Sequence, residues 1–139
     1  DKRAAQERFV VSFHQLPEQV KARLWIENDD RTFDTEAALW VARAVGRPMI
    51  LDVHHHRLLR DDEWSLWLEP VLATWGSVRP KLHFSSPRDG KRSREHADGI
   101  NPADFRGFLD RLGAREVDVM LECKLKDQAL LQLRRDLDL

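Results

Sequence analysis

The sequence has little cysteine, no excess of charge of one sign and no long hydrophobic run. Its single cysteine, Cys123, cannot form an internal disulfide, which fits a reducing compartment and predicts a cytoplasmic location. No apolar run approaches the roughly 20 residues that a membrane span needs, and the first residues do not resemble a signal peptide. The net charge of −1 excludes a generic polyanion binder, so contact with nucleic acid requires a local basic patch or a bound metal.

Several catalytic and architectural signatures are also missing. The chain has no glycine-rich phosphate-binding fingerprint and no convincing Ser/His/Asp set. No low-complexity tract, proline-rich or glycine-rich linker, or break in composition divides it. We therefore expect residues 1–139 to form one domain.

What the sequence does contain is a strand-then-helix pattern that recurs about every 30 residues. Short apolar runs predict strands at residues 22–27, 49–53, 80–84 and 117–122. Helical spacing predicts helices at residues 4–14, 35–45, 61–76, 102–112 and 127–137, with a helical turn at 16–21. We expect Trp25, inside the first strand, to belong to the core. Four parallel strands alternating with helices make an α/β fold, half of a (β/α)8 TIM barrel.

Capping residues support these helix boundaries. Asp34 and Asn101 stand where helix N-caps are expected, and Gly46 suits the position after the C-terminus of the helix at 35–45. Asp61 or Asp62 is the expected cap of the helix that follows the second strand.

Each predicted strand ends in a residue that can bind a metal. In sequence order these are Glu27, Asp52 with His55, Lys81 with His83, and Glu122. Active sites of parallel β/α barrels lie at the carboxyl ends of the strands. The pattern therefore predicts a metal site along one edge of the sheet.

The most informative of these motifs is Asp52-Val-His-His55-His. A carboxylate and an imidazole three residues apart, just after a buried strand, can turn toward one cation. A mixed set of carboxylates and imidazoles favours Mn²⁺, Zn²⁺ or a similar ion over Ca²⁺. The alternative is a polar loop with solvated histidines, and His54 and His56 are weaker candidates, one of which is expected behind the site or facing a helix.

The glutamates at the ends of the first and last strands have two interpretations. Glu27 either binds the metal or forms a cap or salt bridge with the loop that follows it. Glu122 raises the same question, with Lys124 as its alternative partner. A lone buried carboxylate is costly, so each needs a partner of one kind or the other.

Lys81 and His83 alternate with Leu82 and therefore point to the same side of their strand. Lys81 either pairs with Glu27 or Asp52, or is carboxylated by CO₂ and becomes a metal ligand itself. The sequence leaves both interpretations open.

The long polar loop at residues 85–100 carries a further histidine and several cations. His96 is either solvated or a ligand that joins the others at the rim. The basic residues suit contact with DNA phosphates, although a solvated loop is an equal alternative; they are Arg88, Lys91, Arg92 and Arg94.

Taken together, these motifs resemble the C-terminal half of a UV damage endonuclease. The resemblance runs in order from about residue 16 to residue 131, through Glu27-Asn-Asp-Asp, Asp52-Val-His-His, Lys81-Leu-His83-Phe, His96-Ala-Asp and Leu-Glu122-Cys-Lys. That family resembles the wider xylose-isomerase-like barrels, which include abasic-site nucleases of the endonuclease IV type. Those nucleases carry an Asp-x-His pair in the loop, where this chain has Arg94-Glu95-His96.

The resemblance implies a site and an activity. The implied metal ligands are Glu27, Asp52, His55, His83, His96, Glu122 and a carboxylated Lys81, with Lys81, Glu27 and Glu122 as catalytic residues. The implied cofactor is a divalent metal, Mn²⁺ first, then Zn²⁺, Co²⁺ or Mg²⁺. The implied reaction is a nick in double-stranded DNA immediately 5′ to a pyrimidine dimer or related lesion, as a step of nucleotide excision repair.

The same resemblance implies that an N-terminal half, with four strands and further histidine ligands, is missing. A half barrel exposes two sheet edges, so we expect either the other half or a second copy of this chain to cover them. We expect the isolated chain to be poorly active. The alternative functions are a sugar isomerase or epimerase of the same superfold, an abasic-site endonuclease, and an inactive folded fragment.

Overall fold

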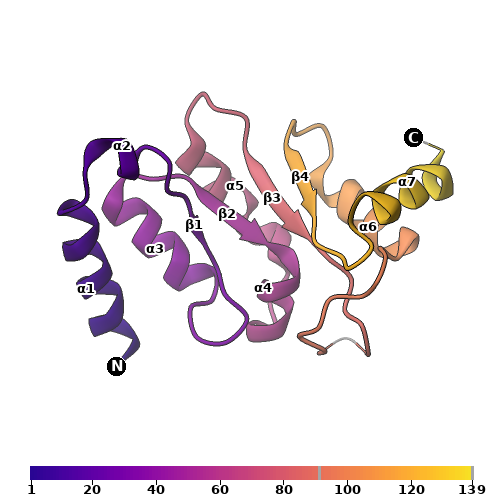
Figure 1. The fold of residues 1–139 in the computed structure, drawn as a ribbon, viewed down its shortest axis with the longest axis horizontal. Helices are drawn as coiled ribbons and strands as arrows, with labels where there is room; N and C mark the ends of the chain where they lie inside the picture. The colour runs from indigo at the N-terminus through magenta and orange to yellow at the C-terminus, as the bar shows by residue number, and fades with distance from the viewer. Residues whose placement is uncertain (91, 139) are drawn as a thin grey trace.

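The computed structural model describes residues 1–90 and 92–138, and its centre is a parallel sheet of four strands in the order β1-β2-β3-β4. The strands are β1 (Ile26–Glu27), β2 (Met49–Asp52), β3 (Lys81–Phe84) and β4 (Asp118–Leu121). Figure 1 shows them side by side, with their arrowheads pointing the same way. The predicted four parallel strands alternating with helices are confirmed.

Helices connect the strands and flank the sheet. They are α1 (Lys2–His14), α2 (Glu18–Lys21), α3 (Thr35–Val45), α4 (Val53–Leu59), α5 (Leu68–Leu72), α6 (Pro102–Leu112) and α7 (Lys126–Leu137), with 3₁₀ turns η1 (Trp64–Trp67) and η2 (Ala73–Trp75) on either side of α5. In Figure 1, α1 and α3 lie at the β1 end of the sheet, and α6 and α7 at the β4 end.

The predicted caps of α3 and α6 are confirmed. Asp34 accepts a hydrogen bond from the Ala37 amide at 3.0 Å, and Asn101 accepts one from the Asp104 amide at 3.1 Å. Gly46 ends α3 with a φ of 63°, a left-handed conformation that glycine adopts without strain.

The core lies between the sheet and its helices. Leu51, Leu82 and Phe84 of β2 and β3 are fully buried. The Phe84 ring packs 4.8 Å from that of Phe108 and 5.2 Å from that of Phe105, both on α6. This packing fixes the strands from which the polar rim extends.

The first strand is shorter than predicted. The reason is that the residues before it continue the turn of α2: Ala22 is helical, and the amides of Arg23 and Leu24 bond to carbonyls within that turn. The Arg47 guanidinium also holds this segment, donating hydrogen bonds to the carbonyls of Ala22 and Leu24 at 2.8 and 3.1 Å. The prediction that Trp25 belongs to the core is wrong, since the side chain is 39% exposed and packs against Trp75.

Two features of the second β/α unit also differ from prediction. Residues 53–59 form α4 rather than a loop, because the Asp52 side chain caps the helix. Asp62 does not cap the helical segment after it, since its carboxylate instead accepts from Arg60 and Trp67. That segment is broken into 3₁₀ and α turns, and Pro70 contributes by lacking the N–H that would bond to the Leu66 carbonyl.

Among the residues that the structure describes, no helix is both long enough and apolar enough to cross a membrane.

Candidate metal centre

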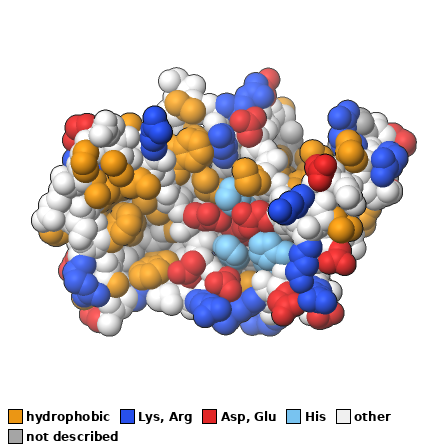
Figure 2. All heavy atoms as spheres, in the orientation of Figure 1, with side chains coloured by type: hydrophobic (Ala, Val, Ile, Leu, Met, Phe, Trp, Pro, Cys, Tyr) orange, Lys and Arg blue, Asp and Glu red, His pale blue; other side chains and the backbone are white. Residues whose placement is uncertain are grey.

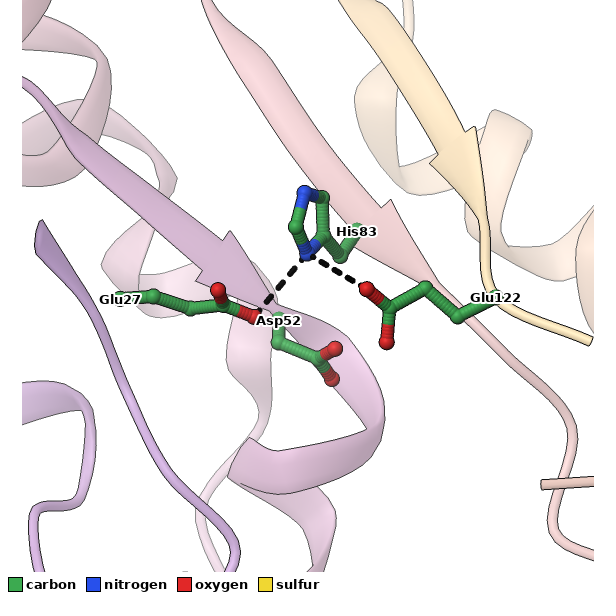
Figure 3. A group of neighbouring side chains, drawn as sticks. All are labelled: Glu27, Asp52, His83 and Glu122. Carbon is green, nitrogen blue, oxygen red and sulfur yellow. Dashed lines mark hydrogen bonds and ion pairs between the residues drawn. The ribbon is translucent and has the colours of Figure 1, made fainter. Parts of the chain in front are cut away.

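Consecutive strands deliver the predicted ligands to one edge of the sheet. Glu27 ends β1, Asp52 ends β2, His83 lies within β3, and Glu122 directly follows β4. Asp52 and His83 are register partners across β2 and β3. Figure 3 shows the four side chains converging on one point at the carboxyl ends of the strands.

These four side chains form a compact group. One ligand atom from each of Glu27, Asp52, His83 and Glu122 lies within 4.8 Å of all the others. His83 Nδ1 is 3.0 Å from a Glu27 oxygen and 3.2 Å from a Glu122 oxygen. Both glutamates thus face His83, and their role as metal ligands stays a prediction.

The two other predicted histidines lie beside this group. His55 Nδ1 is 3.8 Å from Asp52 Oδ2 and 4.0 Å from Glu27 Oε1. His96 Nδ1 is 3.8 Å from Glu122 Oε2. The structure therefore brings the six carboxylate and imidazole candidates together, and their role as ligands stays a prediction.

Lys81 lies apart from the carboxylates. Its Nζ is 4.5 Å from the centre of the Trp25 ring, a cation–π contact. In the described part of the chain no ion pair joins Lys81 to Glu27 or Asp52. The simple ion pair considered from sequence is therefore absent there, while carboxylation stays a prediction.

Asp52 carries the clearest sign of a missing partner. Its side chain is completely buried; Oδ1 accepts a hydrogen bond from the His55 amide at 2.8 Å, while Oδ2 has no hydrogen-bond partner. Burial, with the nearby charges of Glu122 and Glu27, raises the pKa of Asp52 to about 6. A buried carboxylate oxygen without a donor is costly, so the site fits a cation.

His83 gives the second sign. Burial alone would lower its pKa, but hydrogen bonds to Glu122 and Glu27 outweigh burial and raise the pKa to about 10. Conversely, the bond to His83 lowers the pKa of Glu122. A proton thus holds positive charge between carboxylates, the place that a metal ion would take. The group can hold a metal.

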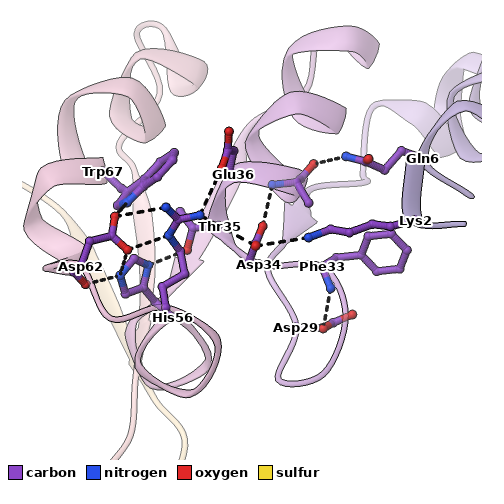
Figure 4. A network of polar contacts seen from close by, with 12 residues as sticks. Lys2, Gln6, Asp29, Phe33, Asp34, Thr35, Glu36, His56, Asp62 and Trp67 are labelled. Carbon is purple, nitrogen blue, oxygen red and sulfur yellow. Dashed lines mark hydrogen bonds and ion pairs between the residues drawn. The ribbon is translucent and has the colours of Figure 1, made fainter. Parts of the chain in front are cut away.

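The remaining histidines of α4 have different surroundings. His56 is buried and uses both ring nitrogens, at 2.7 Å from Thr35 Oγ1 and 2.9 Å from the Asp62 carbonyl (Figure 4). His54 is also buried, and its ring meets that of His96 edge to face at 5.4 Å. His54 therefore lies directly behind a candidate ligand, while His56 faces away into a structural network.

The basic loop lies next to the acidic cluster. Figure 2 shows carboxylates and histidines gathered in the middle of one face, with Lys and Arg side chains around them. The loop arginines are held by surface ion pairs: Arg88 with Glu95 at 2.8 Å, Arg92 with Asp61 at 3.1 Å and Arg94 with Asp30 at 3.9 Å. Lys91, also predicted to contact phosphate, lies outside the described residues.

Sequence reasoning missed one residue of the site. Asn28 belongs to the turn signal Asn28-Asp29-Asp30 that follows Glu27 in the sequence, yet it is 1% exposed and bonded to the Asp52 backbone. The available signal was its place, directly after Glu27 at the end of a strand. The turn itself is present, because an Asp29 oxygen accepts the amides of Arg31, Thr32 and Phe33.

The fold and this site define a class: a parallel β/α protein with a metal-binding group at the carboxyl ends of its strands. Comparison with known proteins identifies the family. The family model described as UV-endonuclease UvdE matches residues 1–139, and the chain belongs to that family. The resemblance predicted from sequence is confirmed.

Individual relatives agree with this assignment. The chain is 41% identical to a UV DNA damage endonuclease of Bacillus pumilus and 35% identical to one of Halalkalibacterium halodurans, over 99% and 96% of its length. The crystal structure of SacUVDE matches with a TM-score of 0.89 and 35% identity over 99% of this chain.

The chain spans less than half of these proteins. It covers 45% of the Bacillus relative, 44% of the Halalkalibacterium relative and 47% of the SacUVDE chain. With four parallel strands, it therefore has the fold of half a (β/α)8 barrel, as predicted.

Proposed function

We propose that this chain is the metal-binding catalytic half of a DNA-repair endonuclease that nicks double-stranded DNA immediately 5′ to UV photoproducts such as pyrimidine dimers. The observation that carries the proposal is the buried, unpartnered Asp52 oxygen within a converging group of carboxylates and imidazoles. The family membership supports the reaction, since the matched relatives are named UV DNA damage endonucleases. We place the reaction in nucleotide excision repair, in the cytoplasm.

The proposed cofactor is Mn²⁺, with Zn²⁺, Co²⁺ and Mg²⁺ as alternatives, because the donor set mixes carboxylates with imidazoles. Bound there, a divalent cation would activate water and neutralise charge on the scissile phosphate. Glu27 and Glu122 both approach the same nitrogen of His83, Nδ1, at 3.0 and 3.2 Å. His55 and His96 complete the proposed ligand set.

Lys81 is proposed to act as a carboxylated lysine. The ammonium first loses a proton, and the neutral amine then reacts with CO₂, which forms an N–C bond and releases a second proton, so that a cation becomes a carboxylate. Lys81 starts β3 two residues before His83, so both side chains leave the same side of the strand. Mass spectrometry of the intact chain under native conditions tests this, by the added mass of CO₂ in the natural chain and not in a Lys81→Ala variant.

The basic loop is proposed to contact DNA phosphates, through Arg88, Lys91, Arg92 and Arg94. Arg92 and its partner Asp61 have side chains that are 77% and 93% exposed. Such exposed ion pairs contribute little stability, so a phosphate can replace the carboxylate at small cost. The loop therefore offers positive charge beside the proposed metal without opposing the fold.

The partner of the chain is proposed to be the other half of the barrel or a second copy of this chain. β1 and β4 are the edge strands of the described sheet, and apolar side chains lie exposed near them, including Trp25 and Met120. Sedimentation with and without Mn²⁺ distinguishes a monomer from a dimer. Because this chain spans 45% of its Bacillus pumilus relative, we expect little nicking by the isolated chain.

The decisive experiment uses a chimera in which this chain replaces the matching segment of the Bacillus pumilus relative. With Mn²⁺ it is expected to nick UV-irradiated supercoiled plasmid and to leave undamaged plasmid intact. An Asp52→Asn chimera is expected to bind DNA without nicking. A folded chimera that nicks both plasmids equally, or neither, would refute the proposed reaction, and strong incision by the isolated chain would refute its dependence on a second half.

A further inference from the structure

Asn28 occupies an unusual position in the fold. It directly follows Glu27 at the end of β1 and is 1% exposed. Its side-chain amide bonds to both backbone groups of Asp52: Nδ2 donates to the Asp52 carbonyl and Oδ1 accepts from the Asp52 amide, each at 2.9 Å. The side chain thus reaches Asp52, which lies two residues beyond Ile50, the partner of Glu27 in the last register pair of the backbones.

The backbone of Asn28 makes a further contact, with His55. The Asn28 carbonyl lies 2.9 Å from His55 Nδ1. A carbonyl oxygen only accepts hydrogen bonds, so Nδ1 must carry the proton. In neutral His55 the lone pair for a metal is then on Nε2.

Asp52 and His55 are also joined to each other. The His55 amide donates to Asp52 Oδ1 at 2.8 Å, the bond by which Asp52 caps α4. Asn28 after β1, Asp52 at the end of β2 and His55 in α4 therefore form a closed ring of four hydrogen bonds. The Asp52 oxygen left outside this ring is Oδ2, which is buried and without a partner.

We propose that Asn28 is a positioning residue of the metal centre, and this proposal rests on the proposed function. Its side chain fixes the backbone of Asp52, and with it the direction of Oδ2. Its carbonyl fixes the ring of His55 with Nε2 available for a cation. Hydrogen bonds of this kind behind metal ligands orient them and set the tautomer of histidines.

A plain structural role is the competing explanation, and Gln6 supplies a matched control. Gln6 is also a buried amide, 6% exposed, and its Nε2 donates to the Ala37 carbonyl at 2.9 Å, which joins α1 to α3. A Gln6→Ala variant removes a comparable hydrogen bond outside the ring. Any loss of stability common to both variants can then be separated from an effect on the metal.

The experiment compares Mn²⁺ binding by the natural chain and by Asn28→Ala, Asn28→Asp and Gln6→Ala variants, with circular dichroism to verify folding. Asn28→Ala is expected to weaken Mn²⁺ binding about 10- to 100-fold. Asn28→Asp keeps the acceptor for the Asp52 amide and is expected to lose less Mn²⁺ affinity. It serves as the test if the alanine variant does not fold. Gln6→Ala is expected to leave binding unchanged.

A second measurement, ¹⁵N NMR of the histidine rings without metal, is expected to show the proton of His55 on Nδ1 in the natural chain. Unchanged Mn²⁺ binding in folded Asn28 variants, or a proton on Nε2 of His55, would overturn the role of Asn28. Absence of Mn²⁺ binding by the natural chain itself would instead refute the metal centre, and with it this role of Asn28. The two failures are distinguishable, because in the first the natural chain still binds Mn²⁺.

Discussion

Two polar clusters lie on either side of α4, and they are built on opposite principles. In the network of Figure 4, charges alternate: Arg60 contacts Asp62 at 2.7 Å, Glu36 at 3.2 Å and Asp34 at 3.8 Å. Asp34 also contacts Lys2 at 3.2 Å, so each of these three carboxylates faces a cation. In the group of Figure 3, carboxylates instead gather around one imidazole.

Neighbouring histidines show the same contrast. His56 has both ring nitrogens within hydrogen-bonding distance of Thr35 and Asp62 and has no capacity left for a ligand. His55, one residue earlier, lies near Asp52 and Glu27 with one nitrogen engaged by a backbone carbonyl. A satisfied polar cluster stabilises the fold, whereas an unsatisfied one can hold a ligand, and this difference underlies the roles proposed for the two clusters.

The largest expected effect comes from Asp52→Asn. This change removes the buried charge but keeps an oxygen to cap α4. Mn²⁺ binding should weaken by more than about 100-fold, which is the upper end of the loss in affinity when a residue that only supports a metal ligand is removed. The metal-free chain should be as stable as the natural one or more stable, because an unpaired buried carboxylate opposes folding. Isothermal titration and urea unfolding measure the two effects.

Asp62→Asn is the matched control in the satisfied cluster. It should leave Mn²⁺ binding unchanged and lower stability, since the Asp62 carboxylate accepts from Arg60 and Trp67. If Asp52→Asn destabilised the metal-free chain as Asp62→Asn does, the distinction between the clusters would be wrong.

The next largest effect is on stability, from His56→Leu. Removing this ring leaves Thr35 and the Asp62 carbonyl without their partner, which should cost about 2 kcal/mol in the free energy of unfolding. His55→Leu should cost less in stability, because its ring is partly exposed, and more in metal affinity. Urea denaturation and Mn²⁺ titration of both variants check this, and equal effects on both quantities would contradict it.

The two clusters should also respond at opposite ends of the pH scale. The pKa of His83 is raised to about 10, so its stabilising contribution is complete below about 6.5 and is lost as pH rises toward 10. The pKa of Asp62 is lowered to about 2, chiefly by its hydrogen bond to Arg60, so its contribution is present above about 4 and is lost as pH falls.

The deprotonation of Asp52 lowers stability as the pH rises, in the same direction as the deprotonation of His83. Burial raises its pKa to about 6, so its ionisation costs stability as pH rises from about 4 through 6. In chelator, we therefore expect the Tm to fall between pH 7 and 10, and much less in a His83→Gln variant. An Asp62→Asn variant should instead show a smaller decrease in Tm as the pH falls on the acid side of the profile. An alkaline decrease of the same size in His83→Gln would show that His83 is not its cause.

The position of the candidate ligands at one edge of the sheet was predictable from sequence, because it depends on where the strands end. Alternation and helical spacing place Asp52 and His83 on consecutive parallel strands, and the carboxyl ends of such strands meet at one edge. The length of β1 was not predictable, because the residues before it continue the turn of α2 and are held there by Arg47 from another loop. Neither was Asn28, whose role depends on reaching across to Asp52.

The smallest expected effect on stability is that of Arg92→Ala in the basic loop. Its ion pair with Asp61 is highly exposed, so the free energy of unfolding should change by less than about 0.5 kcal/mol. Binding of the chimera to DNA should nevertheless weaken, and the slope of log affinity against log salt should decrease by about one. Arg3→Ala is the control for loss of one surface cation far along the chain from the loop; it breaks an exposed pair with Glu7 and a cation–π contact with Trp40. Equal salt slopes for the two variants would remove Arg92 from the DNA contact. A difference confined to Arg92 would instead mean that the loop binds phosphate with side chains the fold does not need, so that stability and DNA binding depend on separate charges.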